Sequence, residues 1–202
     1  MASIYDLKPR FQALLRPLTR WLAGAGVTAN QVTVFAALLS AAAGVVVYLR
    51  PAARWPLLLI PGVLFARMAL NAIDGMLARE HGQKSRLGAV LNELGDVVAD
   101  AALYLPLAAV PGVSPPLVVA IVLLAVIAEM AGVVGVQIGA SRRYDGPMGK
   151  SDRAFAFGLL ALLLGLGVAP GRWTTALLAL VALLASLTII NRSRRALAEP
   201  PA

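Results

Sequence analysis

The carboxylates are the residues of this 202-residue chain that are best suited to chemistry, because the alternatives are scarce. The absence of cysteine excludes disulfides, thiolate zinc sites and thiol nucleophiles, and His81 is the only imidazole. Half of the ten acidic residues lie in or beside long apolar segments. A carboxylate inside a membrane costs at least ~2.5 kcal/mol, so each one needs a partner, a bound cation or water. These acids are Asp74, Glu93, Asp96, Asp100 and Glu129.

Polar side chains gather on two consecutive predicted helices within residues 71–100. At ~100° per residue, Asn71 and Asp74 lie ~60° apart on the first helix. On the second helix, an arc of ~100° holds four oxygen-bearing side chains, namely Asn92, Glu93, Asp96 and Asp100. Hard divalent cations prefer carboxylate and amide oxygens, so the spacing predicts a Mg²⁺ or Mn²⁺ site where these faces meet.

Glycines and cations flank these oxygens. Gly75 and Gly88 remove side chains where a ligand or a neighbouring helix would approach. Polar groups that could hold a phosphate lie between them, namely Arg79, Lys84, Ser85 and Arg86. Together these residues predict a cradle for a phosphorylated group.

Apolar helices must position this cluster. The chain is 59% apolar and 14% charged, whereas soluble domains carry about 25% charged residues. A membrane-crossing helix takes ~20 residues. The sequence therefore predicts an all-α, integral membrane bundle of six transmembrane helices, at residues 31–49, 56–78, 87–110, 116–138, 154–168 and 173–191.

The N-terminal segment predicts a different kind of helix. Apolar residues recur there at helical spacing with cations among them, which is typical of an amphipathic helix on a membrane surface. The apolar residues are Phe11, Leu14, Leu15, Leu18, Trp21 and Leu22, and the cations are Lys8, Arg10, Arg16 and Arg20. The predicted organisation is thus an interfacial helix at 1–27, a six-helix domain at 28–192 and a short basic tail at 193–202.

Charge gives the bundle an orientation. Most of the 18 lysines and arginines fall on the side that holds both termini, so the positive-inside rule places both termini in the cytoplasm. The net charge of +8 raises the question of nucleic-acid binding. We expect no nucleic-acid partner, because the charges lie at the ends of spans, where anionic lipid headgroups are the nearer partner.

The segment 71–96 resembles the signature of the CDP-alcohol phosphotransferase family, integral membrane enzymes of phospholipid synthesis. The family pattern is Asp-x2-Asp-Gly-x2-Ala-Arg-x8-Gly-x3-Asp-x3-Asp. It is matched here at Asp74, Gly75, Ala78, Arg79, Gly88 and Asp96. Asn71 and Asn92 stand in place of its first and third aspartates. The six spans, the surface helix and the Gly-Val-Thr-Ala-Asn-Gln-Val-Thr run at 26–33 extend the resemblance over nearly the whole chain.

The resemblance implies an activity. A member of the family would transfer a phosphatidyl group from CDP-diacylglycerol to an alcohol or phosphorylated alcohol, with release of CMP, in phospholipid biosynthesis. It would lie in the inner (cytoplasmic) membrane as a multi-pass protein among membrane lipids, and homodimers are common in the family.

The resemblance also implies residue roles. Mg²⁺ or Mn²⁺ would be held at Asn71, Asp74, Asn92 and Asp96, and Asp96 would also take the proton of the attacking alcohol. The CDP group would contact Gly75, Arg79, Ser85 and Gly88. Glu93 and Asp100 are auxiliary acids that could restore the charge lost at the two asparagines.

The connection at 141–153 carries four cations and a Gly-Pro turn. Lys150 and Arg153 could bind an anionic acceptor there, such as a phosphorylated alcohol. Ordinary positive-inside charge explains the same residues equally well, so both readings stay open.

The two asparagines also motivate a different function. They reduce the formal charge of the four motif positions by half, which makes the binding of two dications doubtful. A catalytically impaired relative could instead bind a CDP-lipid or an anionic lipid as a scaffold or regulator. A small cation transporter is a weaker alternative, because the acids gather at one end of the predicted spans.

Overall fold

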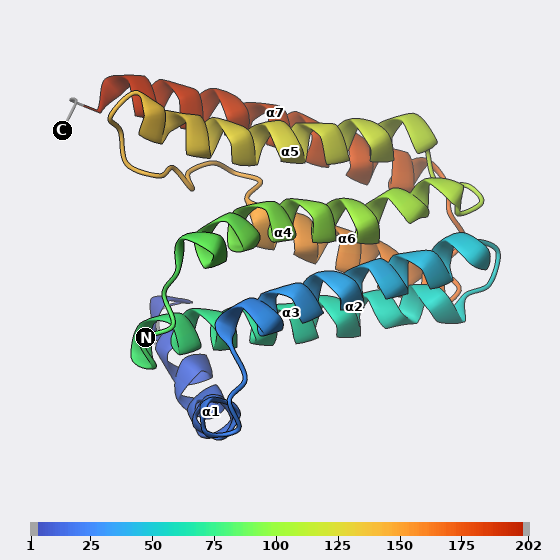
Figure 1. The fold of residues 1–202 in the computed structure, drawn as a ribbon. Coiled ribbons are helices and arrows are strands. Elements are labelled where there is room, and N and C mark those ends of the chain that lie inside the picture. Colours follow the sequence, from blue (N-terminus) through green and yellow to red (C-terminus); the bar gives the residue numbers. More distant parts are fainter. Residues whose placement is uncertain (1–3, 200–202) are drawn as a thin grey trace. The chain divides into compact units, whose positions relative to one another are not determined.

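The computed structural model describes residues 4–199, with side chains from residue 9 onward, and all regular elements in that range are helices. The predicted all-α class is therefore confirmed. Figure 1 shows the order of the elements along the chain. They are α1 (Ile4–Gly24), α2 (Ala29–Leu49), α3 (Trp55–Glu80), α4 (Arg86–Tyr104), the 3-10 helix η1 (Leu105–Ala109), α5 (Pro115–Gln137), α6 (Lys150–Gly165) and α7 (Arg172–Ala198).

Five of the six predicted apolar spans each overlap one α-helix, and the span predicted at 87–110 overlaps α4 and η1. Thr28 and Gln31 cap α2 reciprocally: the Gln31 backbone N–H donates to Thr28 Oγ1, and the Thr28 N–H donates to Gln31 Oε1. Within the described range, four helices are long and apolar enough to cross a membrane, namely α2, α3, α5 and α7. Helix α6 has 16 residues, and α4 carries three acids.

The third predicted span, 87–110, is not one continuous α-helix. Helix α4 ends at Tyr104, and η1 follows it with Pro106 near its start. Proline has no N–H to donate to the carbonyl of Ala102, one turn earlier. Helix α2 approaches this carbonyl at Gly44, where a Cβ atom would collide with Ala102 O. The change of helix type thus coincides with a close backbone contact.

The chain forms two compact units, and the first comprises Met1–Ala42 and Gly62–Ala99. Its core is a buried cluster from α2 and α3, against which α1 packs. The core residues are Ala29, Val32, Ile73, Met76 and Leu77, and the residues of α1 on this core are Leu15, Leu22 and Ala23. Arg16 of α1 donates to both carboxylate oxygens of Glu80 at 3.0 Å, so that α1 is fastened to the end of α3.

The second unit comprises Ala43–Pro61 and Asp100–Ala202. Helix α5 packs along α7 there, as Figure 1 also shows. Small and branched apolar side chains are buried on both helices, including Val118, Ile121, Val181 and Ala185. Tyr104 of α4 stacks on Phe157 of α6 with ring centroids 4.3 Å apart.

Helix α7 continues to Ala198, past the predicted limit of the six-helix domain at residue 192. The last three residues of the predicted tail, 200–202, lie outside the described residues, as do residues 1–3 and the side chain of Lys8.

Candidate functional site

Helices α3 and α4 bring two of the predicted site residues into contact. The Asn71 side chain of α3 donates from Nδ2 to Asp96 Oδ1 of α4 at 3.2 Å. Asp74 follows Asn71 by one turn on α3 and is buried. Residues three apart share a helix face, so the spacing predicts that Asn71 and Asp74 lie on one face of α3. The sequence analysis predicted that this face meets the polar face of α4, which carries Asp96.

Arg67 also reaches Asp96, a contact that the sequence analysis did not predict. Its Nη2 atom lies 3.9 Å from Asp96 Oδ1, the same oxygen that Asn71 contacts. The Arg67 side chain is 5% exposed, while that of Asp96 is 27% exposed. Arg67 precedes Asn71 by four residues, and i,i+4 spacing was the signal that could have placed both on one face of α3.

Asp74 has a hydrogen-bond partner from α2. Thr33 Oγ1 donates to Asp74 Oδ2 at 2.8 Å, so the hydroxyl holds one carboxylate oxygen of a residue that is 6% exposed. Thr33 was not predicted as a site residue. Thr33 is the last residue of the family-like run at 26–33, and this run was the only feature of the sequence that pointed to it.

The glycines of the motif leave room for polar side chains. The Arg79 guanidinium lies over Gly75, where an added Cβ would meet its Nη2 atom at 3.0 Å. An added Cβ at Gly88 would meet Asn30 Oδ1 at 2.8 Å and Ser85 Oγ at 3.0 Å. Both glycines therefore sit beside polar atoms that a ligand could use.

Ser85 has a structural role that the sequence analysis did not assign. Its Oγ accepts a hydrogen bond from the Gly88 backbone N–H at 2.9 Å, which is the geometry of an N-cap for α4. The serine is exposed, so the hydroxyl remains accessible to a ligand.

The two remaining predicted positions on this part of α4 are more open. Asn92 is exposed, and its neighbour Glu93 is half-buried. Within residues 4–199, no group of three or more aspartate, glutamate, histidine or cysteine side chains could hold a metal ion.

The motif side chains include two carboxylates, fewer than the divalent-cation cluster that the family resemblance implies. Asp96 Oδ1 faces the amide N–H₂ of Asn71 and the guanidinium of Arg67, both of which are hydrogen-bond donors and cannot ligate a cation. Asp74 Oδ2 faces the Thr33 hydroxyl. The predicted site thus offers two carboxylates with amide and hydroxyl neighbours, a donor set that is poor in charge for two dications.

The second unit contains another charged cluster, centred on Glu129 of α5. Its carboxylate contacts three guanidinium groups: Arg142 at 3.2 Å, Arg153 at 3.0 Å and Arg192 at 3.2 Å. Arg153 also lies 3.6 Å from Asp100. Arg153 and Arg192 are almost fully buried. The structure therefore brings Asp100 and Arg153, both predicted site residues, into contact with each other.

The loop between α5 and α6 lies tightly against α5. Arg142 approaches Gly132 so closely that a Cβ at this glycine would overlap its Nη1 atom. The Arg143 backbone N–H donates to the Gly132 carbonyl at 3.4 Å. Lys150, the other predicted acceptor-binding residue, is the first residue of α6 and is half-buried.

A third set of ionic contacts joins this loop to the end of α7. Asp145 accepts hydrogen bonds from Arg143 Nε at 2.8 Å and Arg195 Nη1 at 2.7 Å. Burial alone would raise the pKa of Asp145, but the hydrogen bonds and positive charge of Arg143 and Arg195 outweigh it and hold the pKa below its usual value.

Glu199 completes this set. It accepts from the Ser141 backbone N–H at 3.0 Å, from Ser141 Oγ at 2.9 Å and from Arg143 Nη1 at 2.7 Å. The Ser141 bonds, with a smaller contribution from Arg143, lower the pKa of the Glu199 carboxyl.

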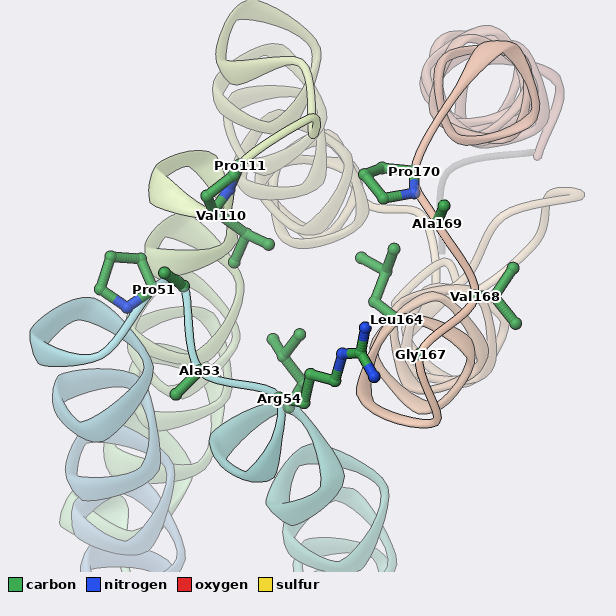
Figure 2. Close-up of a pocket in the computed structure, with 12 residues that line it drawn as sticks. Pro51, Ala53, Arg54, Val110, Pro111, Leu164, Gly167, Val168, Ala169 and Pro170 are labelled. Atoms are coloured by element: carbon green, nitrogen blue, oxygen red, sulfur yellow. The ribbon is translucent and has the colours of Figure 1, made fainter.

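A pocket of about 220 Å³ lies at three loops of the second unit. Figure 2 shows the Arg54 guanidinium pointing across it toward Gly167. Pro51, Pro111 and Pro170 contribute much of the remaining wall. None of the residues predicted for chemistry lines this pocket.

Comparison with known proteins gives two curated relatives. The chain is 45% identical over 197 residues to the inner membrane protein YnbA of Escherichia coli (strain K12), covering 96% of both proteins. It is 30% identical over 103 residues to the archaetidylinositol phosphate synthase of Pyrococcus horikoshii, which is 50% of this chain and 52% of that protein.

Solved structures with the same fold come from the phosphatidylinositol phosphate synthase PgsA1 of Mycobacterium tuberculosis. The complex with manganese and citrate has a TM-score of 0.76 at 22% identity, covering 91% of this chain and 89% of that one. The structure with CDP-DAG bound has a TM-score of 0.74 at 23% identity, with 91% and 94% covered.

A sequence profile matches far more of the chain than the motif does. The profile is that of the CDP-alcohol phosphatidyltransferases, and the match covers residues 26–195, from the loop before α2 to the last turn of α7. It thus includes the motif residues, the cluster around Glu129, the helices α2, α3 and α5, and α7 up to Arg195. The chain belongs to the CDP-alcohol phosphatidyltransferase family.

Proposed function

We propose that this protein is a membrane enzyme that transfers a phosphatidyl group from CDP-diacylglycerol to an alcohol, with release of CMP, in phospholipid biosynthesis. The observation that carries the proposal is the contact between Asn71 and Asp96 at 3.2 Å, which joins the two halves of the family motif on α3 and α4. Family membership and the CDP-DAG complex of a protein with the same fold support the choice of donor.

The residues of the first unit have distinct roles in this proposal. Asp96 accepts the proton as the alcohol oxygen bonds to phosphorus, while the bond from phosphorus to the CMP oxygen breaks. Asp96 is accessible enough for this role, with 27% of its side chain exposed. Arg79, whose guanidinium lies over Gly75, binds the diphosphate. Ser85 and Gly88 form the edge of the site on α4.

Mg²⁺ or Mn²⁺ is the cofactor that we propose. A manganese ion is bound in the Mycobacterium tuberculosis structure, and its counterpart here would have to use Asp74 and Asp96 with amide neighbours. Two carboxylates among the four motif positions are poor in charge for two cations.

The acceptor is proposed as an alcohol, with or without a phosphate. Lys150 and Arg153 remain the proposed contacts for it. Arg153 is already paired with Glu129 and Asp100, which reduces the positive charge it can offer to a phosphate. Lys150, at the start of α6, is half-buried, whereas Arg153 is almost fully buried.

The membrane arrangement is part of the same proposal. We infer six spans, with α4 and α6 crossing the bilayer in addition to the four apolar helices, in the inner membrane with both termini in the cytoplasm. Leu14, Leu18 and Trp21 of α1 are exposed, which supports an amphipathic helix at the membrane surface. The homodimer remains a prediction from the family resemblance.

The test is CMP release by the detergent-purified full-length protein. We expect release from CDP-diacylglycerol that depends on one member of a panel of serine, inositol, glycerol phosphate and inositol phosphate. Assays with Mg²⁺, with Mn²⁺ and with EDTA show the metal requirement directly. The variant Asp96→Ala should lose the activity, whereas Arg50→Gln, in the loop before α3, should keep it. Silence across the whole panel would contradict the proposal.

A second candidate function is supported by the same contacts. A catalytically impaired relative would bind a CDP-lipid or an anionic lipid without turnover, and the two donors that face Asp96 Oδ1 favour this reading. The double variant Asn71→Asp with Asn92→Asp distinguishes the two. If it creates CMP release in a protein that has none, the second function is correct.

A further inference from the structure

Among the described residues that line the pocket of the second unit, Arg54 is the only charged one. Its guanidinium lies over Gly167, where an added Cβ would meet Nη1 at 2.7 Å and Cζ at 3.2 Å. Figure 2 shows this side chain reaching across the pocket. Gly167 also has a φ of +97°, a conformation that glycine adopts without strain. The turn after α6 therefore leaves the space that the guanidinium occupies.

The fold itself does not use the Arg54 guanidinium. Over residues 9–199, it has neither an ion-pair partner nor a hydrogen-bond acceptor. An arginine beside a helix C-terminus often binds the last carbonyls of that helix. Here the carbonyls of residues 162–164 instead accept hydrogen bonds from the backbone N–H groups of Leu166, Gly167 and Val168. The donors of Arg54 therefore remain available to a ligand, and a guanidinium binds phosphate oxygens well.

The pocket has the size and the preformed shape of a site for a headgroup. Its volume of about 220 Å³ far exceeds the ~10–15 Å³ that one water needs. It is smaller than the ~300–1,000 Å³ of pockets that enclose a whole small molecule. Two of its loops are in close contact, because a Cβ at Gly112 would collide with Pro170. A phosphate group therefore fits into the pocket, while a larger substituent stays outside.

The surface around the pocket is positive. The loops at 50–55, 110–115 and 166–172 contain three arginines, Arg50, Arg54 and Arg172, and no acidic residue. All three arginines are exposed. A surface with cations and no acids attracts anions.

The pocket lies at the depth of lipid headgroups. Helix α5 begins shortly after Pro111 and has 23 residues, so its length of ~34 Å is close to the ~30 Å hydrocarbon core of a bilayer. The pocket and the loop at 138–149 therefore lie at opposite membrane surfaces. Trp55 is exposed, and Trp173 donates from Nε1 to the carbonyl of the pocket residue Ala169 at 2.9 Å. Tryptophan is enriched at membrane–water interfaces.

We propose that this pocket binds the phosphate group of an anionic phospholipid, and that Arg54 contacts the phosphate. The acyl chains lie outside the pocket, against exposed apolar residues that line it or adjoin it in the chain, namely Leu58, Leu166 and Val168. With the orientation proposed above, this lipid belongs to the outer leaflet. Only the choice of leaflet rests on the proposed function, because none of the residues proposed for catalysis lines the pocket.

The experiment is a calorimetric titration of the detergent-purified full-length protein with dihexanoyl phosphatidylglycerol, kept below its critical micelle concentration. We expect saturable binding, and weaker binding of dihexanoyl phosphatidylcholine, whose headgroup carries a cation. Arg54→Gln should weaken the binding of phosphatidylglycerol by about tenfold or more, because a hydrogen bond between two charged groups is lost.

Arg50→Gln is the matched control, since it removes a positive charge from the same surface but does not line the pocket. At physiological ionic strength it should change the affinity by less than about twofold, because exposed charges are largely screened. Equal losses in Arg54→Gln and Arg50→Gln would overturn the proposal, since general surface charge would then explain the binding. Saturable binding of inorganic phosphate without binding of phosphatidylglycerol would also overturn it, because the pocket would then hold a free anion.

Asp96→Ala separates this proposal from the proposed function. The variant should bind phosphatidylglycerol as the unmodified protein does. Loss of this binding in Asp96→Ala would place the lipid at the proposed catalytic site and overturn the present inference. Absence of CMP release from the unmodified protein, with the lipid still bound in an Arg54-dependent manner, would overturn the proposed function alone.

Discussion

Asp74 receives a hydrogen bond from a residue outside the motif, and that bond can be tested by itself. Thr33→Val removes the hydroxyl that donates to Asp74 Oδ2 and keeps the shape of the side chain. We expect the free energy of unfolding to fall by ~1–3 kcal/mol, because a buried carboxylate loses a partner.

Thr33→Ser is the control for this substitution, since it keeps the hydroxyl. Unfolding in detergent followed by circular dichroism measures both variants. Equal stability of the valine and serine variants would show that the Thr33 hydroxyl contributes nothing to holding Asp74.

Glu129 gives a second prediction at the scale of one residue. Glu129→Gln leaves Arg142, Arg153 and Arg192 without the charge that they share. We expect a loss of ~3–5 kcal/mol in the free energy of unfolding, because breaking a buried ion pair leaves uncompensated charge. Glu80→Gln, in the exposed pair with Arg16, should change the free energy of unfolding far less in the same assay, because solvent screens an exposed ion pair.

The sequence could identify the members of these contacts but not their pairing. Spacing along α3 and α4 was enough to predict that Asn71 and Asp96 converge. It could not predict that three arginines from a loop, α6 and α7 share Glu129, because those residues are separated by up to 63 positions. Such pairings depend on how helices pack, which local periodicity does not record.

At the scale of elements, the close approach of α2 to α4 at Gly44 can be tested by substitution. Gly44→Ala places a Cβ against the Ala102 carbonyl, so it should destabilise the protein even though alanine favours helices. Gly62→Ala is the matched control in α3, because nothing lies within 4 Å of its added Cβ. The control should be neutral or stabilising by up to ~1 kcal/mol. Melting temperatures that rise for both variants would contradict the close contact.

The loop after α5 depends on acid groups and should respond to pH. The pKa values of Asp145 and Glu199 are lowered, so their contacts stabilise the loop above the ordinary carboxyl pKa near 4, and this stabilisation is lost as pH falls through the lowered values. Hydrogen exchange of residues 138–149, corrected for its intrinsic rate, should be constant from pH 7 to 5 and rise below about pH 4. Asp145→Asn should raise exchange already at pH 7.

Helix positions were predictable because proline and glycine punctuate the apolar runs. The predicted span at 87–110 was wrong in one respect, since its last part is the 3-10 helix η1. Pro106 was visible in the sequence, but hydropathy alone does not record a missing backbone donor.

At the scale of the whole molecule, the uneven distribution of lysine and arginine predicts the topology. The chain has no cysteine, so single cysteines can report on each loop. Arg54→Cys, between α2 and α3, should react with an impermeant maleimide in intact cells. Lys84→Cys, between α3 and α4, should react only after the membrane is opened. The reverse pattern would overturn the positive-inside orientation.

A substitution at Gly132 should be as harmful as one at a catalytic residue, although glycine has no side chain that could act in a reaction. The Arg142 guanidinium occupies the space that a methyl group at position 132 would need, and the next peptide of the loop bonds to the Gly132 carbonyl. An alanine scan of α5 would thus single out this position although it takes no part in any chemical step. Such a scan would detect the space that the Arg142 guanidinium occupies, ten residues further along the chain.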